Sequence, residues 1–130
     1  MIEFHLDARS GVPTYLQLVN QVRQAVRLGI LRPGDQLPTV KEVVGALTIN
    51  PNTVLKAYRE LDHEGIVEGR RGVGTFVSAQ SPSPPPDGMK DLRAALEKWV
   101  ARARSAGVDD EAMAAMLADA THHPRASRVA

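Results

Sequence analysis

Residues 36–65 have the sequence QLPTVKEVVGALTINPNTVLKAYRELDHEG, which contains two helix starts separated by a short turn. Thr39 precedes an apolar run, and Glu42 follows three residues later. This is the pattern of a capping box, in which the hydroxyl accepts a hydrogen bond from the first turn and the carboxylate accepts one from the N–H of the cap. We therefore expect a helix to begin at Thr39 and to end at residues 48–49.

A second helix is expected directly after the first. Asn50 is a favourable N-cap, and Pro51 then occupies the first helical position, where its missing N–H costs nothing. Gly65 is a typical stop. The buried stripe expected for this helix consists of Val54, Ala57, Tyr58 and Leu61. Two helices joined by a turn of about three residues match a helix-turn-helix motif.

The other face of the second helix is polar. Its residues recur at spacings of four, three and four, which places one set on a single side: Asn52, Lys56, Arg59 and His63. Asn50 and Thr53 lie at the N-terminus, where a recognition helix meets base edges. Asparagine can pair with adenine, threonine can contact a thymine methyl, and lysine and arginine suit phosphates. This pattern predicts a helix in the major groove of DNA; the alternative is a solvated helix face.

Residues 66–77, IVEGRRGVGTFV, comprise two β-prone runs on either side of a glycine-rich basic tip, which predicts a hairpin. Arg70 and Arg71 at this tip suit a narrow minor groove, whose negative potential attracts arginine. The alternative is a solubilising loop.

The chain before the motif supplies a further helix, expected over residues 14–28. Ile2 to Leu6 alternate in polarity and are expected to form a short extended arm that packs on a neighbour. Pro33 and Gly34 stand in the order of a type II turn, and residues 36–37 are expected to form a very short strand. Three helices followed by a hairpin make a winged helix-turn-helix, so the predicted fold class is α+β and mainly helical.

Composition bounds the class of protein. The 130 residues allow one domain, or a small domain with an appendage, and their net charge is only +1. The basic groups that bind DNA must therefore be concentrated in one unit. The absence of cysteine fits a reducing compartment, and the N-terminus lacks the apolar core of a signal peptide. We expect a cytoplasmic protein that is not associated with a membrane.

A series of landmarks runs through more than half of the chain at fixed spacing: Pro13-x-Tyr15-x-Gln17, Gly29-x-Leu31-x-Pro33-Gly34-x-x-Leu37-Pro38-Thr39, Asn50-Pro51-Asn52-Thr53-Val54-x-Lys56-Ala57-Tyr58, Glu64-Gly65-Ile66-Val67 and Gly72-x-Gly74-Thr75-Phe76-Val77. This series resembles the DNA-binding domain of the GntR family of bacterial transcription regulators, and the form of residues 50–53 resembles the YtrA-like subfamily. The resemblance implies DNA contacts at Lys41, at residues 50–53, at Lys56 and at residues 71–72.

The candidate DNA-binding residues are therefore Thr39, Lys41, Asn50, Asn52, Thr53, Lys56, Arg59, Arg70, Arg71 and Gly72. Three positions depart from the family pattern. Lys41 stands where arginine is usual and lacks the fork that reads guanine. Thr48 stands where glycine is common and is strained if the turn needs a positive φ. Leu55 replaces a residue that is often basic, which removes one expected phosphate contact.

The last third of the chain predicts an appendage. With residues 1–78 as the DNA-binding domain, we expect a Pro/Ser-rich linker over 79–88, a helical hairpin over 89–123 and a disordered tail over 124–130. Such a hairpin is too small to bury its own apolar face, so a second copy of the chain is expected to cover it. The expected dimerisation residues are Leu92, Leu96, Trp99, Met113 and Leu117. The alternative is that the hairpin packs back on its own winged helix.

Two other classes of function compete with DNA binding. An enzyme needs a catalytic constellation, and the sequence contains neither a nucleophile elbow nor a phosphate loop. The adjacent His122 and His123 point about 100° apart on a helix, so neither a metal nor a cofactor is expected. A winged helix that binds protein instead of DNA is the second rival, and its affinity would be insensitive to salt.

The function expected from the sequence is a homodimeric, sequence-specific DNA-binding transcription regulator, a repressor on a palindromic operator. A small-molecule effector is an additional possible partner. The hairpin is too short to enclose an ordinary ligand pocket, so an effector would bind at the dimer interface.

Overall fold

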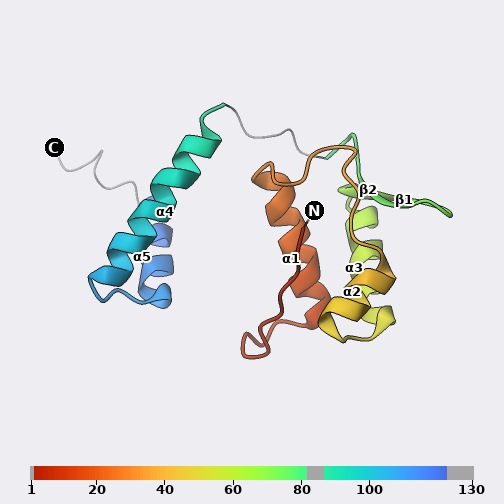
Figure 1. Ribbon diagram of the computed structural model, residues 1–130, viewed down its shortest axis with the longest axis horizontal. Helices are drawn as coiled ribbons and strands as arrows, with labels where there is room; N and C mark the ends of the chain where they lie inside the picture. The colour runs from red at the N-terminus through yellow and green to blue at the C-terminus, as the bar shows by residue number, and fades with distance from the viewer. Residues whose placement is uncertain (1, 82–86, 123–130) are drawn as a thin grey trace. The chain divides into compact units, whose positions relative to one another are not determined.

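The computed structural model describes residues 2–81 and 87–122. The chain divides into two compact units, Met1–Pro86 and Asp87–Ala130 (Figure 1). Residues 82–86 of the predicted linker and the predicted tail over 124–130 lie outside the described residues.

The first unit has the element order expected for a winged helix-turn-helix. Its helices are α1 (Thr14–Arg27), α2 (Val40–Leu47) and α3 (Pro51–His63), and its hairpin is formed by β1 (Val67–Arg70) and β2 (Gly74–Val77). The two strands are antiparallel, with Val67 opposite Val77 and Arg70 opposite Gly74. The predicted mainly helical α+β class is confirmed.

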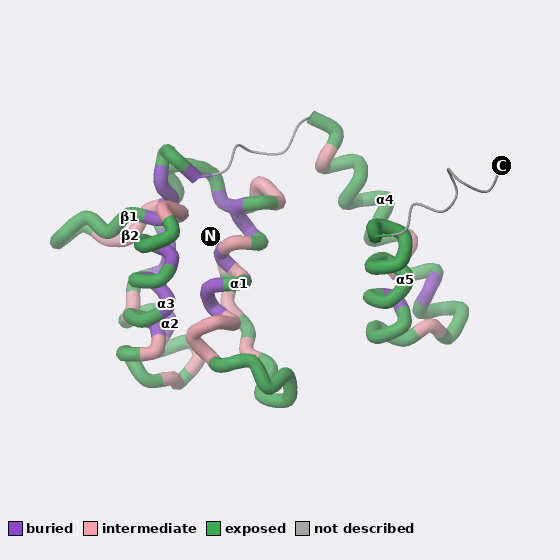
Figure 2. The backbone as a smooth tube through the Cα atoms, turned by 180° about the vertical axis from the view of Figure 1, so that it is seen from behind, coloured by how far each residue is buried: buried purple, intermediate pink, exposed green. Residues whose placement is uncertain are grey.

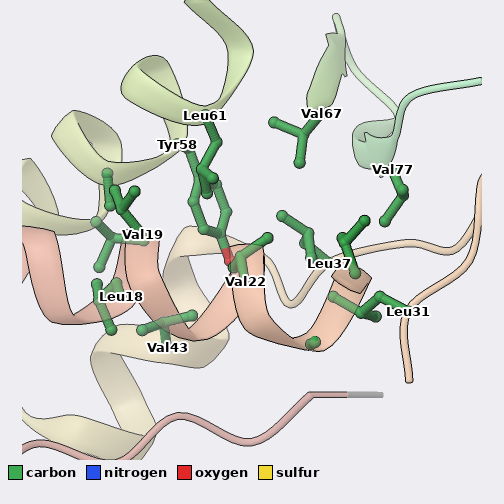
Figure 3. Packing of buried hydrophobic residues seen from close by; sticks show 14 residues of the cluster. Leu18, Val19, Val22, Leu31, Leu37, Val43, Tyr58, Leu61, Val67 and Val77 are labelled. Atoms are coloured by element: carbon green, nitrogen blue, oxygen red, sulfur yellow. The ribbon is translucent and has the colours of Figure 1, made fainter. Parts of the chain in front are cut away.

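The core of this unit is aliphatic and lies between α1, α3 and the base of the hairpin. Figure 3 shows Val19 and Val22 of α1 on the side of Tyr58 and Leu61 of α3, whereas Leu18 lies on the side of Val43 of α2. Residues from the turn before α2 and from the two strands close the core: Leu31, Leu37, Val67 and Val77. The predicted buried stripe of α3 is confirmed, because Val54, Ala57, Tyr58 and Leu61 are all buried.

Both helix starts of the motif are formed as the sequence predicted. The backbone N–H of Glu42 donates to the Thr39 hydroxyl at 3.1 Å, and the backbone N–H of Thr39 donates to the Glu42 carboxylate at 3.0 Å. The pKa of Glu42 is lowered by the hydrogen bond from the Thr39 backbone N–H to its carboxylate and by one from the Thr39 side chain, because both favour the charged form of the carboxylate. At the next start, the Asn50 side chain accepts from the backbone N–H of Asn52 at 2.8 Å.

The turn between α2 and α3 contains a strained residue. Thr48 ends α2 with φ 54° and ψ 53°, which is the left-handed region, and its N–H donates to the carbonyl of Val44 at 2.8 Å. Thr48 is the one non-glycine residue with positive φ among the described residues. The departure from the glycine usual at this position therefore has a conformational cost.

The N-terminal arm packs on its own chain. Ile2, Phe4 and Leu6 are half-buried against the core of the first unit. The Gln21 side-chain amide accepts from the backbone N–H of His5 at 3.1 Å and donates to its carbonyl at 2.6 Å. Gln17 forms the same pair with Asp7, at 2.8 and 3.0 Å. The alternating sequence predicted that the arm packs on a neighbouring element, and that element is α1.

The segment before α2 braces the hairpin. The predicted turn at Pro33 and Gly34 is present, with the N–H of Asp35 donating to the carbonyl of Arg32 at 2.9 Å and Gly34 at φ 93°. The chain then runs beside β2, where the expected short strand is a single bridge between Gln36 and Phe76. The N–H of Leu37 donates to the Thr75 carbonyl at 2.8 Å, which extends this pairing.

The second unit is a pair of helices, α4 (Met89–Ser105) and α5 (Asp110–His122). The Asp109 carboxylate accepts from the N–H of Ala112 at 2.8 Å, so the predicted cap is confirmed. Among the described residues of this unit only Ala103 and Met113 are buried, and Figure 2 shows the exposed surface along both helices.

Thr48→Gly should raise the free energy of unfolding. The left-handed conformation costs a residue with a side chain about 1–2 kcal/mol. Glycine avoids this cost, but it loses more conformational entropy on folding, which reduces the gain by about 0.5–1 kcal/mol. The expected net gain is about 0.5–1 kcal/mol in urea denaturation. Thr48→Ala is the matched control, since it keeps a Cβ and should gain much less. Equal gains in both variants would contradict a backbone origin.

Candidate nucleic-acid interface

The recognition surface begins with the polar stripe of α3. Asn52, Lys56 and Arg59 are exposed along one side of the helix, as is His63 near its end. The opposite side is fixed in the core, so this stripe cannot rotate away from the surface. The sequence prediction of one polar face is confirmed in its geometry.

The N-terminus of α3 combines a cap with open polar groups. The Asn50 side-chain oxygen is used as the cap, which leaves its NH₂ group as a donor at the surface. Thr53 is half-buried, and no acidic residue lies in the first turn. The unpaired N–H groups of a helix N-terminus favour an anion, so this end suits a phosphate or the edge of a base.

A buried hydrogen bond fixes α3 against the start of α2. The Tyr58 hydroxyl donates to the carbonyl of Pro38 at 2.6 Å. Burial raises the pKa of Tyr58, and the nearby charge of Glu42 raises it further, so the hydroxyl remains a donor. Pro38 directly precedes the cap residue Thr39, and Lys41 lies exposed in the first turn of α2. The bond thereby fixes the candidate residues of α2 relative to those of α3.

The hairpin holds its two arginines differently. The Arg70 guanidinium pairs with the Glu68 carboxylate at 3.0 Å and lies over the ring of Phe76, 4.5 Å from its centroid. Arg71 follows at the exposed tip with Gly72, which has φ 77°. Among the described residues Arg71 forms no ion pair. The sequence placed both arginines at the tip, whereas Arg70 ends β1 and is restrained on the hairpin itself.

The hairpin is also tied to α3. The Asp62 carboxylate accepts from the backbone N–H of Gly69 at 3.2 Å. Sequence reasoning missed this contact, because a residue in the last turn of a helix bonds to a strand seven positions later and no local motif marks that distance. The orientation of the hairpin is thus coupled to the recognition helix.

Two acidic residues near the end of α3 are already engaged by other elements. The Arg23 guanidinium of α1 forms two hydrogen bonds with the Glu64 carboxylate, one of them from Nε at 2.9 Å. These bonds lower the pKa of Glu64 and keep it ionised. Asp62 is engaged by the hairpin, as described above. Neither Lys56 nor Arg59 forms an ion pair with a carboxylate among the described residues.

One residue of α1 joins the surface without having been predicted. The Lys56 ammonium lies over the ring of Tyr15, with Nζ 4.1 Å from the ring centroid. The sequence places Tyr15 on the apolar face of α1, and its ring is indeed half-buried. Periodicity alone does not reveal that the same ring contacts a cation of α3.

The candidate dimerisation residues differ in exposure. Leu92 is 67% exposed, Leu96 and Leu117 are each 43% exposed, and Trp99 is half-buried. Met113, in contrast, is 5% exposed within the single chain. The apolar surface open to a partner consists of Leu92, Leu96, Met116 and Leu117.

No group of three or more His, Cys, Asp or Glu side chains in residues 2–81 and 87–122 is arranged to hold a metal ion. His123, one of the paired histidines considered above, lies outside this part of the chain. None of the described helices has the length and apolar character needed to cross a membrane.

Residues 14–77 match the model of the family described as bacterial regulatory proteins, gntR family. The chain is 40% identical over 107 residues to the HTH-type transcriptional repressor YtrA of Bacillus subtilis, covering 82% of each chain.

Solved structures agree with this match. The GntR-family transcription factor YtrA from Sulfolobus acidocaldarius has a TM-score of 0.54 and 28% identity, over 75% of this chain and 97% of that chain. The N-terminal domain of AraR in complex with a mutant operator has a TM-score of 0.51 and 26% identity, over 54% of this chain and all of that domain.

These relatives are transcription regulators and not enzymes. The match spans α1 to β2, which are the elements that build the candidate recognition surface. The chain belongs to the gntR family of bacterial regulatory proteins, with a winged helix-turn-helix as its family domain.

Proposed function

We propose that this chain is a homodimeric repressor that binds a palindromic operator and occludes a promoter. The observation that carries the proposal is the exposed stripe of α3, where Asn52, Lys56 and Arg59 share one face and neither cation forms an ion pair with a described residue. A surface of this kind is complementary to the major groove, which is lined by phosphates and by hydrogen-bonding base edges.

Within this proposal α3 reads sequence and α2 fixes the register. Asn52 pairs with an adenine, and Asn50 and Thr53 contact neighbouring base edges or the adjacent phosphate. Lys56 and Arg59 bind phosphates. Thr39 and Lys41 at the start of α2 contact the backbone, where the charge of a lysine is sufficient and the fork of an arginine is not needed.

The hairpin contributes through its tip. Arg71 enters the minor groove beside the recognition helix, with Gly72 allowing a close approach of the backbone. Arg70 is compensated by Glu68 and stacked on Phe76, so its role is to stiffen the hairpin behind the tip. The hydrogen bond between Asp62 and Gly69 fixes the orientation of the hairpin relative to α3. Arg71 therefore reaches the minor groove while α3 occupies the major groove.

Dimerisation is assigned to the second unit. Ala103 and Met113, the two buried residues within 87–122, are far too few to stabilise a helical pair alone, and very small units usually need a metal, a disulfide or a partner chain. Leu92, Leu96 and Leu117, with half-buried Trp99, form the proposed interface. A two-fold dimer presents two recognition helices to two half-sites, which is why a palindromic operator is proposed.

Repression is supported by the role of a relative. The similar protein of Bacillus subtilis is a repressor, and the AraR domain of related fold is bound to operator DNA. A dimer that covers promoter DNA blocks transcription by exclusion, without any further activity.

The alternative is a winged helix that binds protein without specific DNA binding. It is disfavoured by the exposed, unpaired charges of Lys41, Arg59 and Arg71 among the described residues, because such charges favour a polyanion.

Selection from randomised duplex DNA at physiological salt tests the proposed function. The purified wild-type protein should enrich an inverted repeat whose half-sites are about one helical turn apart, or a multiple of it. Enrichment of a single half-site would argue against the dimer. Binding that is insensitive to salt would favour the protein-binding alternative.

Asn52→Ala and Arg71→Ala should separate reading of sequence from attraction to DNA. Asn52→Ala should weaken specific binding about tenfold or more, since a good bidentate base contact is worth about 1–3 kcal/mol, and should leave binding to random DNA nearly unchanged. Arg71→Ala should weaken both and lower the slope of log K against log salt by about 1. The measurement is a salt titration on both DNAs. Equal losses from Asn52→Ala would remove Asn52 from the base-reading set.

Leu96→Asp should dissociate the dimer, because it places a charge in the proposed apolar interface. Sedimentation velocity should show a monomer, and affinity for the inverted repeat should fall while binding to a single half-site persists. Ala94→Asp is the matched control, since Ala94 is exposed on the other side of α4 and should leave the dimer intact. A dimeric Leu96→Asp variant would contradict the proposed interface.

A further inference from the structure

We infer that Tyr15 of α1 is a positioning residue for DNA binding, and that it acts by holding the Lys56 ammonium through a cation–π contact at the recognition surface. The contact is direct, with Lys56 Nζ 4.1 Å from the centroid of the Tyr15 ring. This inference rests on the proposed function of α3. It assigns a DNA-binding role to a helix that otherwise serves as part of the scaffold.

The packing of the two helices holds the ring in place. Tyr15 contacts Lys56, and eight residues further along both helices Arg23 bonds to Glu64. Equal spacing on α1 and α3 means that the helices run in the same direction and are held together at two points eight residues apart. The Tyr15 ring is half-buried against the core, so it cannot follow a mobile lysine. The lysine is therefore held by a rigid element.

The choice of an aromatic ring has an electrostatic consequence. A carboxylate partner would fix Lys56 but would also cancel its charge, and DNA would have to displace it. Arg70 is in that position, since Glu68 pairs with it at 3.0 Å. The face of a ring attracts a cation through its quadrupole and carries no net charge. Lys56 is thus restrained while its full positive charge stays available to a phosphate.

Restraint matters because lysine has a long, flexible side chain. An ammonium that is already in place loses less freedom when it meets a phosphate, and this preorganisation strengthens binding. The other residues of the stripe are not restrained by an aromatic ring. Asn52 and Arg59 are exposed and contact no ring in the part of the chain that the structure describes.

The test is a double-mutant cycle on DNA affinity. Wild type, Tyr15→Leu, Lys56→Ala and the double variant are titrated with the selected operator over a range of salt. Tyr15→Leu should weaken binding about two- to fivefold, which is the fold-change that an exposed cation–π contact is worth. In the Lys56→Ala background the same change should have almost no effect. Any loss of stability from Tyr15→Leu is present in both backgrounds and cancels.

Two further readouts separate positioning from a merely structural role. Lys56→Ala should lower the slope of log K against log salt by about 0.9, because one phosphate contact is lost, whereas Tyr15→Leu should leave the slope unchanged. Tyr15→Phe keeps the ring and should restore wild-type affinity. In the free protein the ε-methylene protons of Lys56 should show an upfield ring-current shift that Tyr15→Leu abolishes.

The experiment tests the positioning role of Tyr15 separately from the proposed DNA binding. An equal loss from Tyr15→Leu in both backgrounds, or tighter binding on removal of the ring, would overturn the positioning role while leaving DNA binding intact. A Tyr15→Phe variant as weak as Tyr15→Leu would assign the effect to the hydroxyl and would also overturn it. A wild-type protein that binds no duplex in a salt-dependent way would overturn the proposed function, and the inference with it.

Discussion

The hydrogen bond between the buried Tyr58 hydroxyl and the Pro38 carbonyl fixes the recognition surface. It joins the middle of α3 to the residue before the cap of α2, so the two helices of the motif cannot shift past each other without breaking it. Loss of one partner of a buried hydrogen bond costs about 1–3 kcal/mol, a large part of the stability of a domain of this size. The aliphatic core around Tyr58 brings the helices together, and this bond sets their register.

The chain has a net charge of only +1, and the proposed DNA binding depends on where each cation is placed. Arg23 is engaged by Glu64 at the far end of α3, and Arg70 is engaged by Glu68 on the hairpin. Lys56 is held by an uncharged ring. Partners that neutralise charge therefore serve the scaffold, while the cation at the recognition surface has a partner that leaves its charge intact. A nearly neutral protein can in this way present a locally basic surface.

Local signals made much of the fold predictable. The starts of α2 and α3 were predicted because Thr39, Glu42 and Asn50 act within three residues of the groups they cap. The strain at Thr48 was foreseen from the family pattern, which commonly has glycine at this position, and the φ of 54° confirms it. The engagement of Arg70, however, depends on a cross-strand neighbour and a side-chain rotamer, which no spacing specifies. Met113 shows a further limit, because periodicity identifies an apolar face without saying which residue is covered within the hairpin.

The two glutamines of α1 explain how a helix can hold an extended chain without a sheet. An extended backbone presents an N–H and a carbonyl at every second residue, and Gln21 and Gln17 satisfy both groups at His5 and Asp7. A carboxylate in their place could accept but not donate, and an ammonium could donate but not accept. These two half-buried helical positions therefore tolerate as narrow a range of amino acids as a core position does, although the restriction comes from hydrogen bonding and not from shape or hydrophobicity.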